Sequence, residues 1–272
     1  IDQEGGRVQR LRAPQWREWQ PPLEVVHQAG AEAPRAMYLM YRLIAHELRS
    51  LGIDSNCAPM VDVLTDATHP FLLNRCYGAE PSYVAEIGRA VATGLLAGGV
   101  LPVLKHMPGH GRTMMDSHFD LPQVDTGLDI LRDTDFVPFR ALRDLPMGMT
   151  AHQVFSAIDD LPATLSEKMM RLIRDDIGFD NLIMTDDISM KALAGAPEDI
   201  ARHAIAAGCD VILYCNAPLR ARHLVCEAAG EMTPSATIRA DRALAMRTSP
   251  DDVDIPALER EFAALMGGTT DG

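Results

Sequence analysis

The chain has 272 residues, of which 47% are hydrophobic, and it carries a formal net charge of −13. This apolar content is enough for a sizeable core and excludes disorder as the overall state. The acidic balance argues against a nucleic-acid partner, because phosphates would repel an acidic surface. No apolar run approaches the ~20 residues that a membrane-spanning helix needs.

The five cysteines form an odd set without the spacing of metal ligands. Cys57, Cys209 and Cys215 lie in or beside apolar runs, so we expect them to be small core residues. Unpaired cysteines of this kind are typical of a reducing compartment, and the sequence therefore predicts a cytoplasmic protein.

In chain order, the first element is a strand exit. The chain begins at Ile1, directly before Asp2-Gln3-Glu4-Gly5-Gly6, and the glycine pair indicates the end of a strand whose body lies upstream. Helical periodicity follows over 36–51 and 82–96, where apolar residues recur at three- and four-residue steps. Thr164 to Glu167 fits a capping box before a third helix, which Gly178 ends.

Short apolar runs between these segments predict five strands, near 53–60, 100–105, 146–151, 181–185 and 210–215. Strands that alternate with helices indicate a parallel sheet of the α/β class, either a barrel or a doubly wound sheet. Polar residues follow every predicted strand, and no G-x-G-x-x-G or Walker pattern occurs. This distribution favours a barrel, which gathers the carboxyl ends of all its strands around one mouth. These polar residues are Asp62, Lys105 with His106, His152, Asp186 and Asn216.

We therefore predict a (β/α)8 TIM-type barrel that forms a single domain over 1–272. Five internal strands and one implied before Ile1 make six, whereas a closed barrel needs eight. The first strands of the barrel are accordingly expected to lie upstream of this chain.

Two segments carry the candidate chemistry. The first is Lys105-His106-Met107-Pro108-Gly109-His110-Gly111 with Asp116-Ser117-His118, and the second is Asp186-Asp187 after an apolar strand. Each also has a structural explanation. Asp186 fits the N-cap of a helix from Met190, although Asp187 is the better cap. Asp116 and His118 alone would suit a solvated loop, and single arginines such as Arg10 and Arg75 are surface residues by default.

Lys105 and His106 could form a structural ion pair or contribute to a metal site. His106 and His110 are four residues apart, a spacing that zinc sites use on helices. Pro108 and Gly109 between them forbid a helix, so sugar binding is favoured over metal. His110 is expected to shape the loop through backbone groups, and the role of His152 stays open.

The chain resembles glycoside hydrolase family 3, and is most similar to its bacterial β-N-acetylglucosaminidases of peptidoglycan recycling. The motifs occur in the family's order over about three-quarters of the chain, and they are IDQEGGRVQRL (1–11), APMVDV (58–63), NRCYG (74–78), KHMPGHG (105–111), DSH (116–118), MTAH (149–152), GFDNLIMTDDISM (178–190) and AGCDVILYCN (207–216). Met107 stands where Phe is common and keeps an apolar wall.

The resemblance implies a role for each motif residue. Asp186 corresponds to the nucleophile, His118 to the general acid/base and Asp116 to the partner that orients it. The residues implied in sugar binding are Asp2, Arg10, Arg75, Lys105 and His106. These roles suit the residue types, because retaining hydrolysis needs a fixed carboxylate and a proton donor, and a histidine already titrates near neutrality.

The expected activity is that of a retaining exo-β-N-acetylglucosaminidase acting on terminal GlcNAc of peptidoglycan-derived muropeptides, without cofactor or metal. A monomer is favoured, with no membrane span and no nucleic-acid partner. Three alternatives remain open: a phosphorolytic transferase on the same scaffold, a metal-dependent barrel hydrolase, and a non-catalytic sugar-binding relic. Product analysis with and without phosphate tests the first, and a chelator test with a metal assay tests the second. The joint presence of Asp186, Asp116 and His118 speaks against the third.

Overall fold

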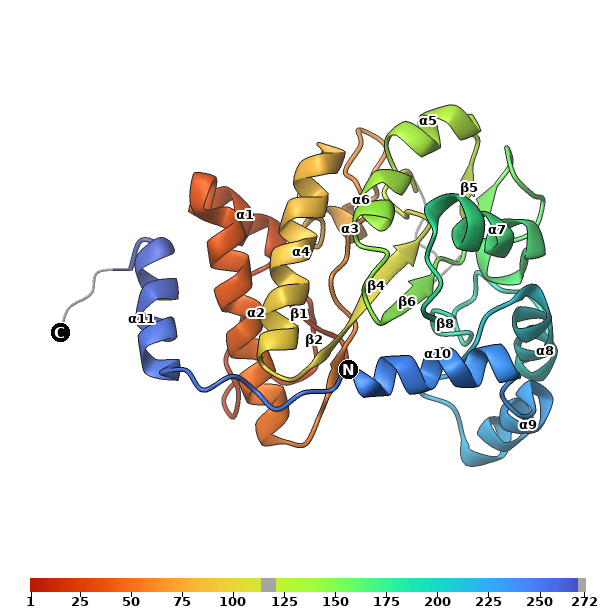
Figure 1. Ribbon diagram of the computed structural model, residues 1–272. Coiled ribbons are helices and arrows are strands. Elements are labelled where there is room, and N and C mark those ends of the chain that lie inside the picture. Colours follow the sequence, from red (N-terminus) through yellow and green to blue (C-terminus); the bar gives the residue numbers. More distant parts are fainter. Residues whose placement is uncertain (114–120, 269–272) are drawn as a thin grey trace.

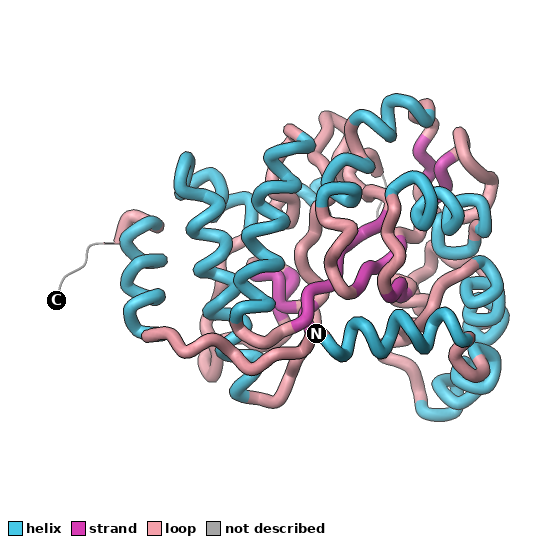
Figure 2. The backbone as a smooth tube through the Cα atoms, viewed as in Figure 1, coloured by secondary structure: helices cyan, strands magenta, loops and turns pink. Residues whose placement is uncertain are grey.

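The computed structural model describes residues 1–113 and 121–268. Short strands lie at the centre, surrounded by helices (Figure 2). The strands are β1 (Gln3–Gly5), β2 (Val8–Gln9), β3 (Ser55–Asn56), β4 (Leu101–Met107), β5 (Gln123–Val124), β6 (Met147–Thr150), β7 (Val154–Phe155) and β8 (Leu182–Met184). The α-helices are α1 (Pro22–Ala29), α2 (Ala33–Ser50), α3 (Pro70–Leu73), α4 (Pro81–Ala97), α5 (Leu128–Asp133), α6 (Phe136–Ala141), α7 (Glu167–Leu172), α8 (Pro197–Ala207), α9 (Leu219–Ala229), α10 (Pro234–Ala245) and α11 (Ile255–Leu265). Within the described ranges, no helix combines the length and the apolar character that crossing a bilayer requires.

The central sheet is parallel and follows chain order, β3-β4-β6-β8. Further parallel contacts extend it at both edges. The Cys57 N–H donates to the Ile1 carbonyl (2.8 Å), and Val211 forms a parallel bridge with Met184. This confirms the α/β class and four of the five predicted internal strands, whereas the segment 210–215 forms no strand and contributes an isolated bridge at Val211. Within this sheet each strand neighbours the sheet's next strand in chain order, which is the order that a barrel requires, while β5 and β7 pair separately.

The glycine pair after Glu4 ends a strand, as predicted. Gly5 closes β1 with φ +102° and Gly6 continues with φ +56°, which turns the chain back into β2. A side chain at Gly5 would meet the Gln20 carbonyl and the Met40 methyl, so both space and backbone geometry call for glycine.

The predicted amphipathic helices are confirmed in α2 and α4, which pack side by side on the outer face of the sheet (Figure 1). Their predicted apolar faces are buried: Met37, Met40, Tyr41, Ile44 and Leu48 on α2, and Val84, Ile87, Val91 and Leu95 on α4. The helix backbones approach closely at Gly94, where any Cβ would collide with the Tyr38 carbonyl oxygen. Their helical spacing therefore reflects burial against each other and the sheet.

The predicted capping box at Thr164 is wrong. Ser166 is the N-cap of α7 and accepts a hydrogen bond from the Met169 N–H (3.0 Å). Thr164 lies in a short 3₁₀ turn, and its hydroxyl contacts Thr150 and His152 instead. The predicted stop at Gly178 is confirmed, because this residue is left-handed (φ +78°) and ends the helical segment that continues α7.

At the amino ends of the strands, α10 covers the inner face of the sheet. It runs beneath β6 and β8 in Figure 1. The apolar residues of this contact are Leu101, Val103, Met147, Met149 and Leu182 on the strands, with Ala240, Ala243 and Met246 on or directly after α10. Since side chains alternate along a strand, Lys105 follows Leu101 and Val103 onto this face. The inner face thus changes from apolar near α10 to charged at the carboxyl end of β4.

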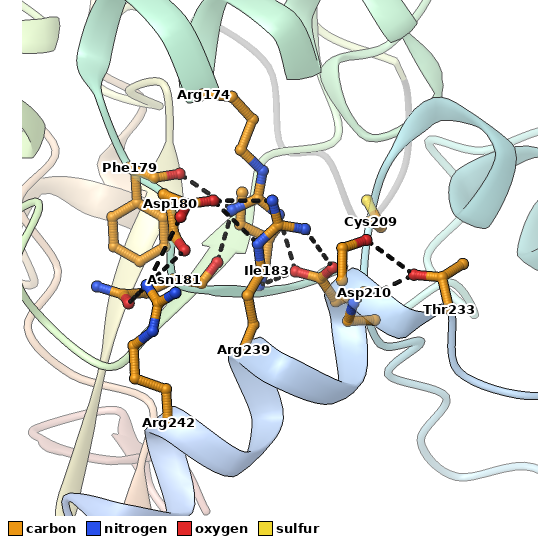
Figure 3. Close-up of polar contacts among 12 residues, drawn as sticks. Arg174, Phe179, Asp180, Asn181, Ile183, Cys209, Asp210, Thr233, Arg239 and Arg242 are labelled. Atoms are coloured by element: carbon orange, nitrogen blue, oxygen red, sulfur yellow. Dashed lines mark hydrogen bonds and ion pairs between the residues drawn. The ribbon is translucent and has the colours of Figure 1, made fainter.

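A buried carboxylate anchors α10 to the start of β8 (Figure 3). Asp210 accepts hydrogen bonds from the Ile183 N–H (2.9 Å) and the Arg174 guanidinium (2.8 Å), and its other oxygen accepts from Arg239 on α10 (3.1 Å). Arg239 also reaches Asp180 at the exposed rim of this network (2.8 Å). One buried anion therefore joins the segment after α7, the strand β8 and the helix α10.

This network predicts unequal costs for two aspartate substitutions. Asp210→Ala leaves the half-buried Arg174 guanidinium without its carboxylate and the Ile183 N–H without its acceptor, and should lower the free energy of unfolding by about 3 kcal/mol. Asp180→Ala removes a carboxylate whose side chain is 63% exposed, and should cost about 1 kcal/mol or less. Urea unfolding of the two variants measures both values. Equal losses would contradict the assignment of Asp210 as the anchor.

Candidate active site

A cavity of about 440 Å³ opens at the carboxyl ends of the parallel strands, where an α/β barrel places its active site. Asp186 lines it together with every predicted sugar-binding residue: Asp2, Arg10, Arg75, Lys105 and His106. The remaining wall includes Phe71, Met149, Asp187, Met190, Leu213 and Asn216. Residues from six separate segments of the sequence thus meet around one cavity.

Asp186 lies two residues beyond β8 and is half-buried. Burial opposes its charge, but His106, His152 and Lys105 together lower the pKa of this carboxyl below its ordinary value. One of its oxygens accepts the Asp187 N–H (2.8 Å). Asp186 is therefore an ionised carboxylate held at the cavity wall.

The alternative explanation of Asp186 as a helix N-cap is wrong, because no helix begins at Met190. The chain passes through turns there, and the next helix, α8, begins at Pro197 with Ala196 as its N-cap. Asp187 instead accepts the backbone N–H groups of Ser189 (2.9 Å) and Cys215 (3.0 Å). It ties this loop to the neighbouring strand segment.

Glu4 is a buried carboxylate that binds two of the predicted cations. Arg75 donates to both of its oxygens, through Nε and Nη2, at 2.9 Å each, and Lys105 Nζ lies 2.5 Å away. Against the cost of burial, Arg75 and Lys105 lower the pKa of Glu4 to about 2. Burial likewise opposes the charge of Lys105, but Glu4 and Asp2 raise its pKa. All three groups are therefore charged, and Arg75 is not a surface arginine.

Asp2 and Arg10 lie at the rim of the cavity. Lys105 is the main cause of the lowered pKa of Asp2, whose Oδ1 is 3.2 Å from the Lys105 Nζ. Arg10 follows β2, keeps 64% of its side chain exposed, and lies 3.8 Å from Asp2. An acceptor and an exposed donor are thus available at the entrance.

Asp62 lies behind His106 and is completely buried. Its Oδ2 is 2.7 Å from His106 Nδ1, and its Oδ1 accepts the backbone N–H groups of His110 (2.6 Å) and His106 (3.3 Å). Burial opposes the charge of Asp62, but His106 and His110 lower its pKa. This carboxylate fixes the turn after β4.

His110 shapes the loop, as expected, through its own backbone and side chain. Its N–H binds Asp62, and its Nδ1 lies 2.8 Å from the Thr113 hydroxyl. Burial and the nearby His106 lower the pKa of His110 to about 4, so its ring is neutral near pH 7. The rings of His106 and His110 meet edge to face at 5.6 Å.

His152, whose role the sequence left open, is a buried support beneath the Asp186-Asp187 loop. Its Nδ1 lies 2.7 Å from the Thr164 hydroxyl, and its Nε2 lies 3.1 Å from the Asp187 carbonyl. Burial lowers its pKa.

Sequence reasoning did not name Glu4 as a site residue, and it named Asp62 only among the polar residues that follow the predicted strands. Asp62 was visible as a polar residue after a predicted strand, and Glu4 as a carboxylate in the strand exit, but their partners are distant in sequence. The predicted pair Asp116 and His118 lies outside the described residues.

Comparison with known proteins identifies the family. Residues 1–242 match the glycosyl hydrolase family 3 N-terminal domain. The chain belongs to glycosyl hydrolase family 3. It is therefore a glycoside hydrolase, and the resemblance seen in the motifs is confirmed.

Several relatives of this family 3 chain have been described. A protein named β-hexosaminidase from Nitrosospira multiformis is 33% identical, over 93% of this chain and 74% of its own length. NagZ from Neisseria gonorrhoeae, solved in complex with N-trifluoroacetyl-D-glucosamine, is 31% identical in sequence. The two structures align with a TM-score of 0.81, over 98% of this chain and 79% of that one. A family 3 β-N-acetylglucosaminidase from Paenibacillus is also 31% identical, with a TM-score of 0.79 over 100% and 51% of the two chains.

The Glu4 cluster predicts a stability loss that depends on pH. Glu4→Gln keeps the shape but removes the carboxylate that Arg75 and Lys105 share, and leaves Lys105 with Asp2 alone, which should cost about 3–5 kcal/mol near pH 7. Because the pKa of Glu4 is lowered from 4.5 to about 2, its contribution is complete above the ordinary pKa and is lost as the pH falls through about 2. The difference between wild type and variant should therefore shrink from pH 5 to pH 2.

Urea unfolding at each pH measures this difference. Glu18→Gln is the matched control, because it neutralises a glutamate whose side chain is 49% exposed and pairs with Arg12. A Glu4→Gln penalty that is the same at pH 2 and pH 7 would rule out a charged Glu4 as its source.

Proposed function

We propose that this enzyme is a retaining exo-β-N-acetylglucosaminidase. The observation that carries the proposal is the ionised Asp186 carboxylate at the wall of a cavity that also presents Lys105, Arg75, Asp2 and His106. A charged carboxylate beside several hydrogen-bonding groups is what a double-displacement mechanism needs at the anomeric carbon. The β-hexosaminidase names of the relatives support the same activity.

In this mechanism Asp186 attacks C1 of the terminal sugar while His118 protonates the leaving oxygen. A covalent glycosyl-enzyme forms, and His118 then deprotonates the water that releases the sugar. Asp116 orients His118. The assignment of these two residues rests on the DSH motif, and the loop that leads to it is held by Asp62 and Thr113 beside the cavity.

The charged groups of the cavity include both hydrogen-bond donors and an acceptor for the sugar hydroxyls. Lys105 and Arg75 act as donors that Glu4 keeps charged and in place, while Asp2 acts as an acceptor near the rim. The ammonium of Lys105 also favours the ionised form of Asp186. One set of contacts therefore binds the hydroxyls and keeps the nucleophile ready.

We further propose that the substrate is a muropeptide with a terminal β-linked GlcNAc, hydrolysed in the cytoplasm without a cofactor. The motifs shared with the peptidoglycan-recycling branch of the family support this substrate, and the size of the cavity, about 440 Å³, suits a site that takes the end of a chain. Release of GlcNAc from muropeptides of defined structure tests it.

Removal of the nucleophile should stop turnover. Asp186→Ala should lower hydrolysis of an aryl β-GlcNAc by about 10³-fold or more, because no group remains to form the covalent intermediate. Added azide can enter the vacated space and should restore turnover as the α-glycosyl azide. Thermal melting provides the folding control. Near-normal hydrolysis by the variant would disprove the assignment of Asp186.

Removal of the acid should affect substrates according to their leaving groups. His118→Ala should slow a glycoside with a poor leaving group far more than an activated aryl glycoside, which needs little protonation. The comparison of kcat/KM for the two substrates, each against wild type, gives the ratio. Equal losses on both would place the proton donor elsewhere.

A further inference from the structure

The buried contact between Asp62 and His106 determines which ring nitrogen of His106 carries the proton. We propose that Asp62 is a positioning residue that sets the tautomer of His106, so that the ring presents an acceptor nitrogen to a sugar hydroxyl. The role in sugar binding rests on the proposed function, whereas the tautomer is a property of the free enzyme. Nothing in the motif comparison assigns Asp62 a part in the site.

The two oxygens of Asp62 have different partners. Oδ1 accepts the backbone N–H groups of His106 and His110, at 3.3 and 2.6 Å. Among the residues that the structure describes, the hydrogen-bond partner of Oδ2 is the ring, at 2.7 Å from His106 Nδ1. An ionised carboxylate can only accept hydrogen bonds, so the proton of the neutral ring lies on Nδ1. The lone pair of the neutral ring then belongs to Nε2.

The ring separates Asp62 from the cavity. His106 lines the cavity, whereas Asp62 is completely buried and does not reach it. Lys105, Arg75 and Arg10 already supply donors to the same space. Within the described residues, Nε2 of His106 has no hydrogen-bond partner, so the neutral form of the ring adds an acceptor among these donors. A hydroxyl bound there can then both accept and donate.

The geometry predicts what an isosteric substitution does. In Asp62→Asn, the two backbone N–H groups retain the side-chain oxygen, since an NH₂ group in that place would oppose both donors. The amide NH₂ then faces His106 Nδ1 and donates to it. The proton must move to Nε2, and the ring changes from acceptor to donor on the cavity side. In serine proteases an aspartate also binds the Nδ1–H of the catalytic histidine. Its replacement by asparagine there lowers activity because the histidine takes the wrong tautomer.

The tautomer is measured directly by NMR on the full chain labelled with ¹⁵N-histidine, at a pH where the ring is neutral. The signal that disappears in His106→Gln identifies the residue. We expect Nδ1–H in wild type and Nε2–H in Asp62→Asn. The wild-type spectrum decides without any variant of Asp62, and an Nε2–H signal there would overturn the proposal.

Kinetics test whether Asp62 acts through the ring. Asp62→Asn should lower kcat/KM for an aryl β-GlcNAc by about 10- to 100-fold, because the reversed ring opposes a hydroxyl hydrogen with its own proton. In the His106→Gln background, the same substitution should have an effect of about 2-fold or less. If Asp62→Asn lowered kcat/KM as much in the His106→Gln background as in wild type, Asp62 would be merely structural, and the proposal would be overturned.

Asp210→Asn is the matched control. Asp210 is also a buried carboxylate that accepts a backbone N–H, but its partners are Ile183, Arg174 and Arg239 near α10. This variant should be destabilised without a change in the His106 signal. Lack of hydrolysis by the wild-type protein would refute the proposed function alone, because the NMR measurement needs no substrate.

Discussion

The shared contact of Arg75 and Lys105 with the Glu4 carboxylate is the interaction on which the cavity depends. It joins the first strand, the segment after α3 and the end of β4, with Nζ at 2.5 Å and guanidinium nitrogens at 2.9 Å from the carboxylate oxygens. Three charges lie almost wholly out of water, which is costly unless each is matched by close partners. The matching fixes the two cations in space before any sugar arrives.

The site is therefore built in layers of alternating charge. Glu4 and Asp62 are fully buried anions that face the protein interior, and Lys105, Arg75 and His106 lie in front of them at the cavity wall. Asp186 and Asp2 then share the cavity with the two cations Lys105 and Arg75, and Lys105 lowers the pKa of both. Side chains that line the cavity are thus held by carboxylates that lie behind its wall, an arrangement that lets a site reach high precision.

At the amino ends of the strands, the contacts join the sheet to a helix. Asp210 ties β8 to α10, and α10 covers the apolar part of the inner face (Figures 1 and 3). The inner face is apolar at that end and charged at the end of β4. Stability and chemistry thus occupy opposite ends of the same strands, as is usual where parallel strands gather their carboxyl ends around one cavity.

The sequence by itself determined the features that depend on neighbours along the chain. The periodicity of α2 and α4, the apolar strands, the left-handed glycines at Gly5 and Gly178 and the family motifs were all readable, because each is a local pattern. Local reading failed where two local signals competed. Thr164 and Ser166 both suit an N-cap. The hydroxyl of Thr164 instead contacts Thr150, at the end of β6, and His152 just beyond it, and Ser166 caps the helix.

Only the tertiary structure decided which charges are paired. Glu4 binds Arg75 across 71 positions, and Asp62 binds His106 across 44, so neither contact has a signature in the intervening sequence. The resemblance named Arg75, Lys105 and His106 as residues of the site, but it assigned no role to the carboxylates Glu4 and Asp62 that hold them. Burial creates that need, because a charge removed from water must find a partner in space, wherever the chain supplies it.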